Sequence, residues 1–220
     1  MNPPILETYR LVSIFRKIEN GEIRVPAFQR SFVWTEQDIL KLIESVYSGY
    51  PIGTIVFLRA TSKMFESASP RITGFPEVPE QFPVNFIIDG VQRLSSLYNC
   101  FHWKSPEQPD KFNIVFNLDT EQFVHYSKDT LPENYIHLSS VFSPDAFFEL
   151  QSKFLNKKGF DRLVSAATNL HFKFETYEVT TMIINEDDIN QIISIFESLN
   201  NTGVRLTGED LTRAEALRTS

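Results

Sequence analysis

The sequence contains a single cysteine, Cys100, and no apolar run long enough to cross a membrane. One cysteine cannot form an internal disulfide, and a membrane-spanning helix needs about 20 consecutive apolar residues. Residues 1–4 also lack the basic and then apolar order of a secretory signal peptide. These absences predict a cytoplasmic protein without a membrane partner.

Basic residues are also fewer than acidic ones. The sequence has 21 Lys and Arg against 28 Asp and Glu, which gives a net charge of −7. An evenly acidic surface repels a phosphate backbone, so non-specific DNA binding by this chain alone is not expected. A focused phosphate site made from a few arginines is compatible with this charge. The four histidines stand far apart in the sequence, and zinc sites cluster their His and Cys ligands, so a zinc site is not expected.

What the sequence does have is apolar residues, at 42%, with 20 phenylalanines among them. This content excludes a disordered or fibrous protein, and 220 residues are enough for one well-filled core. Hydrophobic periodicity and turn residues predict strands and helices along the chain. The predicted strands are 23–25, 54–58, 84–89, a hairpin within 113–126, and 177–184; the predicted helices begin at caps Thr8 and Thr35, after Gly90, and near 146, 160, 186 and 207.

Strands separated by helices without a strict alternation predict an α+β fold. We expect one small mixed sheet, built from the strands after residue 53 and surrounded by helices, with a helical C-terminal part. The chain is expected to form a single domain over 1–220, with a core at about 8–130 and a helical extension at about 140–220. The last predicted helix is short for its apolar face, so an N-terminal fragment of a longer protein is expected.

The stretch FIIDGVQRLSSLYNCF, residues 86–101, places a strand, a glycine turn and a helix start in succession. A helix N-terminus offers unpaired backbone N–H groups and partial positive charge, and glycine allows an anion to approach the backbone closely. Arg93 adds a planar fork that matches phosphate oxygens, and Gln92 adds a neutral hydrogen bond. Asp89 would cap the helix, orient an arginine or hold a Mg²⁺ that bridges phosphates. The alternative is a capped helix whose Arg93 forms a surface ion pair.

A second polar pair, Gln29 and Arg30, lies within VPAFQRSFVW, between an extended segment and a helix. A guanidinium among aromatic residues is stacked, paired or bound to an anion. Trp34 in the same stretch is interpreted as a core residue that contacts the following helix. The third polar segment is FESLNNTGVRLTGED, in which Asn200 and Gly203 lie between two predicted helices. This segment either faces a nucleotide or is a helix–helix turn.

Together, PAFQRSFVW, FIIDGVQRLSSL and IFESLNNTGVRLTGEDL resemble, in order and spacing, the signature blocks of the ParB/sulfiredoxin-like domain. That domain forms the N-terminal half of GmrSD-type, modification-dependent restriction endonucleases and of related phage-defence proteins. The resemblance covers about residues 23–217. It implies a site that binds and hydrolyses nucleoside triphosphates and thereby controls a nuclease module, usually on the C-terminal side.

Carried over residue by residue, the resemblance assigns Asp89 and Gln92 to catalysis. It assigns nucleotide or phosphate binding to six further residues: Gln29, Arg30, Gly90, Arg93, Asn200 and Gly203. Val91 departs from the family, which has a second glutamine there, and valine can neither donate nor accept a hydrogen bond. The valine at position 91 therefore bears on nucleotide hydrolysis, and not on phosphate binding through Arg93 and the helix terminus.

Two hypotheses therefore stay open. In the first, the chain is a nucleotide-binding regulatory or sensor domain of an anti-phage restriction system, with NTP hydrolysis and Mg²⁺ at its site. In the second, it is a non-catalytic binding module that recognises modified DNA or a partner subunit. The histidines lack the His-Asn-His context of the fused nuclease, so the nuclease module is expected outside this chain.

Overall fold

The computed structural model describes residues 3–27, 29, 32–63, 66–69, 73–104, 110–127, 130–145, 148–149, 152, 159–186, 188, 191–192, 194–195 and 198. They belong to two compact units that alternate along the chain. The first unit comprises 1–33, 53–92 and 178–220, and the second comprises 34–52 and 93–177. The single domain expected from the sequence, with a core at about 8–130 and a helical extension at about 140–220, stays a prediction. The α+β class is confirmed.

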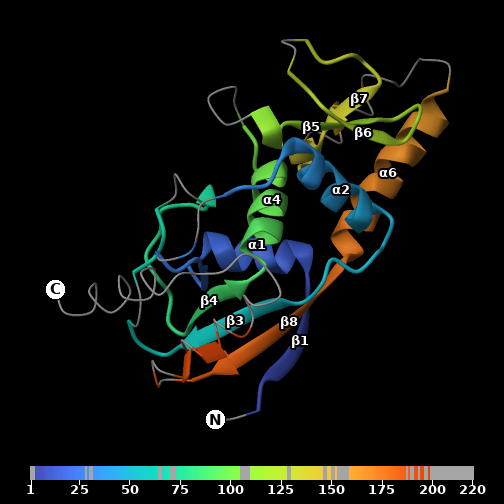
Figure 1. Cartoon of the computed structure of the whole chain (residues 1–220). Helices are drawn as coiled ribbons and strands as arrows, with labels where there is room; N and C mark the ends of the chain where they lie inside the picture. Colours follow the sequence, from blue (N-terminus) through green and yellow to red (C-terminus); the bar gives the residue numbers. More distant parts are fainter. Residues whose placement is uncertain are drawn as a thin grey trace. The chain divides into compact units, whose positions relative to one another are not determined.

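The first unit is built on a five-stranded mixed sheet in the order β1-β8-β3-β4-β2 (Figure 1). Its strands are β1 (Ile5–Arg10), β2 (Ile23–Arg24), β3 (Ile55–Ala60), β4 (Val84–Asp89) and β8 (Glu178–Asn185). β3 pairs in parallel with β8 and antiparallel with β4, while β1 and β2 form the two edges. The predicted short edge strand at 23–25 is thereby confirmed.

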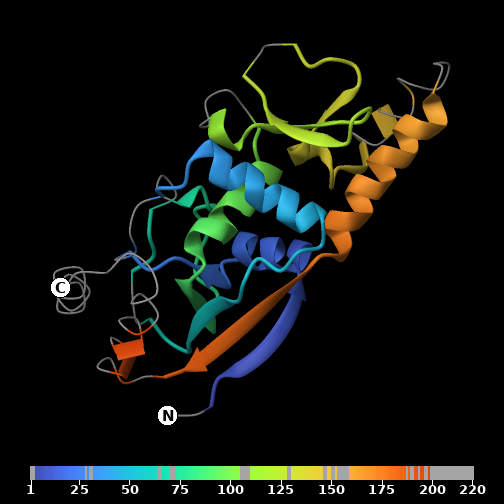
Figure 2. The ribbon, with the colours of Figure 1, turned by 45° about the vertical axis from the view of Figure 1, so that its right-hand side comes forward.

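Each face of this sheet is covered by apolar side chains. Helix α1 (Leu11–Glu19) contacts β1 and β2, and Figure 2 shows it over one face. It buries residues at helical spacing: Leu11, Ile14, Phe15 and Ile18. The other face buries Val56, Leu58, Ala60, Val84, Phe86, Ile88 and Ile184 together with Ile192. Ile192 follows β8 in the segment that the sequence predicted as an apolar helix face, so part of that prediction is confirmed; 189, 193, 196 and 199 lie outside the described residues.

The prediction that Thr8 caps the first helix is wrong. Thr8 lies in β1, where it pairs with Thr180 of β8, and α1 begins three residues later with Arg10 at its N-cap position. Arg10 supplies no side-chain hydrogen bond to the helix. The cause is a partner far along the chain, because β8 provides the ladder hydrogen bonds that make residues 5–10 a strand.

The second unit contains helix α2 (Glu36–Tyr47), most of α4 (Val91–Phe101), α6 (Phe160–Thr176) and the short 3₁₀ helices Asp110–Phe112 and Leu138–Ser140. The capping prediction at Thr35 is confirmed, because its hydroxyl accepts from the Asp38 amide and the Asp38 carboxylate accepts from the Thr35 amide. Gly49 follows the helix with a φ of 74°, as expected of a glycine after a helix end.

The predicted hairpin is confirmed as β5 (Ile114–Asn117) and β6 (Gln122–His125), but it does not join the main sheet. A strand absent from our expectation, β7 (Tyr135–His137), pairs with β5 on its other edge and completes a separate three-stranded sheet. One of its faces carries an aromatic cluster in which Phe116 and Phe123 pack against Tyr47 of α2. Three strands with their own apolar face form an independent sheet.

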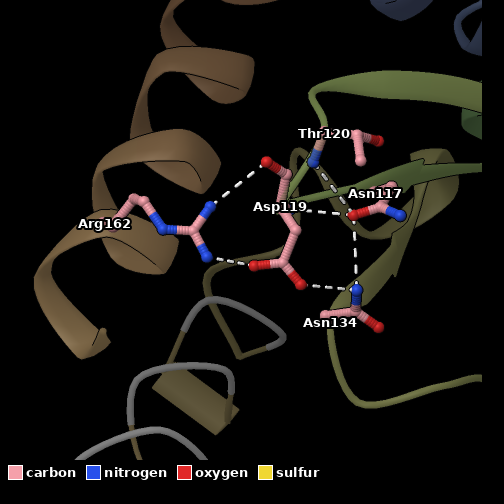
Figure 3. A network of polar contacts seen from close by, with 5 residues as sticks. All are labelled: Asn117, Asp119, Thr120, Asn134 and Arg162. Atoms are coloured by element: carbon pink, nitrogen blue, oxygen red, sulfur yellow. Dashed lines mark hydrogen bonds and ion pairs between the residues drawn. The ribbon is translucent and has the colours of Figure 1, made fainter. Parts of the chain in front are cut away.

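The turn of this hairpin is held by a polar network (Figure 3). The Asn117 side-chain oxygen accepts from the Asp119 and Thr120 amides, at 2.8 and 3.2 Å. Asn134 donates to the Asp119 carboxylate at 2.7 Å, and Arg162 of α6 forms an ion pair with the same carboxylate. The predicted helix near 160 is therefore confirmed and tied to the hairpin, whereas most of the one predicted near 146 lies outside the described residues.

Candidate functional site

The strand, glycine and helix start predicted at residues 86–101 are confirmed. β4 is buried along its length until Asp89, which is exposed at the strand end. Gly90 follows with a φ of 96°, a conformation that residues with a Cβ rarely adopt, and α4 begins at Val91. The corner β4–Gly90–α4 thus combines a carboxylate, a glycine and a helix start, whose first backbone N–H groups have no partner within the helix itself.

A β-bulge precedes this corner. Val56 of β3 lies opposite Asp89, but the next residue, Phe57, lies opposite Ile87, so Ile88 is an extra residue on β4. Bulges disrupt the ladder locally and redirect the following side chain, and they are common beside functional sites. Here the bulge immediately precedes the exposed Asp89.

Gln29 is brought to this bulge from another part of the sequence. Its side-chain nitrogen donates to the carbonyl oxygens of Ile87 and Ile88, at 3.3 and 3.1 Å. Both carbonyls belong to the residues just before Asp89. The structure therefore places Gln29 beside the β4–Gly90–α4 corner, with its side-chain nitrogen facing main-chain carbonyls.

Gln92 makes the complementary contact. Its side-chain oxygen accepts a hydrogen bond from the backbone N–H of Val33 at 2.9 Å, and the Gln92 side chain is buried. The Val33 side chain itself is 60% exposed, so this contact holds a surface segment by its backbone. Gln29 and Gln92 together fix both ends of the 29–33 segment to residues 87–92.

Arg93 begins the part of α4 that belongs to the second unit. Its guanidinium Nη1 donates to the carbonyl oxygen of Ile52 at 2.8 Å, within that unit. Three other predicted site residues, Arg30, Asn200 and Gly203, lie outside the described residues.

The described residues contain no group of three His, Cys, Asp or Glu side chains that could hold a metal ion. Mg²⁺ usually keeps several waters and binds through one or two carboxylates plus substrate phosphates. One exposed carboxylate at the end of β4, that of Asp89, fits this kind of Mg²⁺ site. Among the described residues there is also no helix long and apolar enough to span a membrane.

A cavity of about 280 Å³ in the first unit was not anticipated from the sequence. Its wall includes Arg24, which is buried and donates to the carbonyl oxygens of Pro76 and Val78. Ser67 and Glu80 also line it. The arginine in the short buried strand β2 was the signal available in the sequence, since a charged residue in a buried strand needs partners.

Comparison with known proteins identifies the family of this chain. The family model of the GmrSD restriction endonuclease N-terminal domain matches residues 11–217. An uncharacterized protein of Methanocaldococcus jannaschii is 27% identical over an alignment of 237 residues, which covers 93% of this chain and 41% of that protein. The chain thus spans less than half of the length of this relative. Because the family match extends over nearly the whole sequence, the chain belongs to the GmrSD restriction endonuclease N-terminal domain family.

Proposed function

We propose that this chain is a nucleoside triphosphate-binding regulatory domain of a prokaryotic restriction system directed against modified phage DNA. The family membership supports the restriction system. The nucleotide would act as a signal that controls a nuclease module, carried on the C-terminal side or by a partner subunit. Contact with DNA would occur through the complete protein, because the chain itself is acidic.

The observation that carries the nucleotide proposal is the β4–Gly90–α4 corner. The helix dipole and the backbone N–H groups at the start of α4, together with the close approach allowed at Gly90, suit a phosphate group. Arg93 would supply a charge-assisted contact to the same anion. Asp89 would hold a Mg²⁺ that neutralises phosphate charge, and Arg30, Asn200 and Gly203 would complete the site as the family pattern implies.

Isothermal titration with ATP, GTP, CTP and UTP in the presence of Mg²⁺, followed by a phosphate-release assay, tests this proposal. We expect saturable binding of at least one nucleotide and slow phosphate release that requires Mg²⁺. Absence of binding for all four nucleotides would contradict it. The Asp89→Asn variant is the matched control for the metal, because it keeps the side-chain shape and removes the charge that Mg²⁺ needs.

A second function is favoured by Val91. The first residue of α4 is apolar where the family has an amide, so a hydrogen bond available to relatives is missing. In this alternative the domain binds a nucleotide without hydrolysing it and recognises modified DNA or a partner subunit. Two results would support it: the chain binds a nucleotide without releasing phosphate, and the complete protein is retained on modified DNA.

A further inference from the structure

The two glutamines of the candidate site face main-chain groups with opposite parts of their amides. Gln29 uses its side-chain nitrogen as a donor to Ile87 and Ile88, whereas Gln92 uses its side-chain oxygen as an acceptor from Val33. The partners lie 58 to 59 positions away in the sequence. Each contact therefore joins the 29–33 segment to the strand and helix that meet at Gly90.

The β-bulge explains why a side chain is needed at this place. The pairs between β2 and β4 involve Asn85 and Phe86 of β4, and the ladder between β4 and β3 is interrupted at Ile88, two residues farther on. Carbonyl groups near a ladder interruption need other donors, because an unpaired buried carbonyl is costly. The Gln29 side-chain nitrogen donates to two consecutive carbonyls, which a regular neighbouring strand could not do, because successive carbonyls of a regular strand point to opposite edges.

These contacts leave Gln29 with no side-chain N–H for a phosphate. A primary amide carries two N–H donors, and both carbonyl contacts come from its one nitrogen. The remaining polar atom of the amide is its oxygen, an acceptor, which does not bind a phosphate oxygen. The Gln92 oxygen already accepts from the Val33 N–H, which uses one of its two lone pairs.

We propose that Gln29 and Gln92 are positioning residues, which hold the bulged end of β4 and thereby fix Asp89 and Gly90 for a phosphate ligand. This inference rests on the proposed nucleotide function and changes the roles expected from the family pattern. Gln29 acts through the Ile87 and Ile88 carbonyls, and Gln92 acts through the Val33 amide. Neither contacts the nucleotide.

The test is one substitution at two places, Gln29→Glu and Gln92→Glu. At Gln29 a carboxylate removes both donors and faces two carbonyl oxygens, whereas at Gln92 it keeps the acceptor that Val33 needs. Without nucleotide, we expect a larger loss of melting temperature for Gln29→Glu than for Gln92→Glu. We also expect faster hydrogen exchange of the Val33 amide in Gln92→Ala than in wild type, because its acceptor is gone.

Binding of the nucleotide found by titration should follow the same order. Affinity should fall about tenfold or more for Gln29→Glu, and by a smaller factor for Gln92→Glu. The Gln29→Glu defect should diminish as the pH is lowered, since a protonated carboxyl regains one donor for the carbonyls. A direct phosphate contact predicts instead that both carboxylates repel the ligand comparably and that the nucleotide-free protein is unaffected.

The two possible failures are distinguishable. If wild type binds no nucleotide, the proposed function fails, while the melting and exchange measurements still report on the two contacts. If wild type binds and Gln29→Glu retains both wild-type melting temperature and wild-type affinity, the positioning role is overturned and the nucleotide function stands. Gln37→Glu, on the exposed start of α2, is the control for added negative charge.

Discussion

Gly21 lies so close to the carbonyl oxygen of Pro79 that a Cβ atom at position 21 would overlap it. Gly21 also has a φ of 81°, and its own carbonyl accepts from the Gln81 amide at 3.1 Å. The turn after α1 and the chain that leads into β4 are therefore in backbone contact. A residue with a side chain cannot occupy this position without moving one of the two segments.

Gly21→Ala should be strongly destabilising. Left-handed backbone costs a residue with a Cβ about 1–2 kcal/mol, and forced overpacking adds about 1–3 kcal/mol. Gly49→Ala is the matched control, because Gly49 has a similar φ of 74° but open space around its Cβ position. Urea unfolding of both variants should give the larger loss of unfolding free energy for Gly21→Ala, and equal losses would contradict the steric argument.

The Asp119 contacts predict a pH effect on the second unit. The Arg162 guanidinium, and then the Asn134 amide, hold the pKa of Asp119 below its usual value. Because the pKa in the folded protein is the lower one, the stabilisation is fully present above the unfolded-state value of about 3.9. It is lost as the pH falls through the folded value.

Arg162→Gln should therefore lower the melting temperature by a constant, small amount near neutral pH, and by a decreasing amount below about pH 4. The ion pair is exposed, which keeps the effect small. Carbon-detected NMR titration of the Asp119 carboxyl should show a higher pKa in the variant than in wild type. An unchanged pKa would mean that Arg162 is not the cause, and Arg10→Gln controls for loss of an exposed positive charge.

Arg93→Ala should weaken nucleotide binding by about 10- to 150-fold, which corresponds to roughly 1.5–3 kcal/mol for a charge-assisted contact. Arg93→Lys keeps the charge without the planar fork and should fall between Arg93→Ala and wild type. The variant also loses the bond to Ile52, so its melting temperature has to be measured alongside. A folded Arg93→Ala protein with wild-type affinity would remove the phosphate role, and Arg162→Ala serves as the arginine control.

Val91→Gln should change hydrolysis more than binding. One neutral hydrogen bond contributes about 1 kcal/mol at most to the ground state, so affinity should change less than in Arg93→Ala. A contact made only in the transition state raises turnover without tightening binding. Single-turnover phosphate release is the measurement, with Val91→Leu as an apolar control. A Val91→Gln protein as slow as its parent would show that the valine does not limit catalysis.

Local signals in the sequence were sufficient for much of the fold. The capping box of Thr35 and Asp38, the glycine after α2 and the Asp89–Gly90 corner all depend on residues a few positions apart. Their geometry follows from backbone preferences that neighbouring residues set. The sequence by itself also indicated the family. The three blocks around Gln29, Asp89 and Asn200 could be recognised from their residues and their order along the chain, without the structure.

Only the tertiary structure decided the pairings between distant segments. Residues 5–10 form a strand because β8 lies beside them, and the hairpin forms a second sheet because β7 does. Gln29 and Gln92 have the same side chain, yet one donates and the other accepts. An amide carries both capacities, so its role is fixed by the group that folding places opposite it, and no local pattern contains that information.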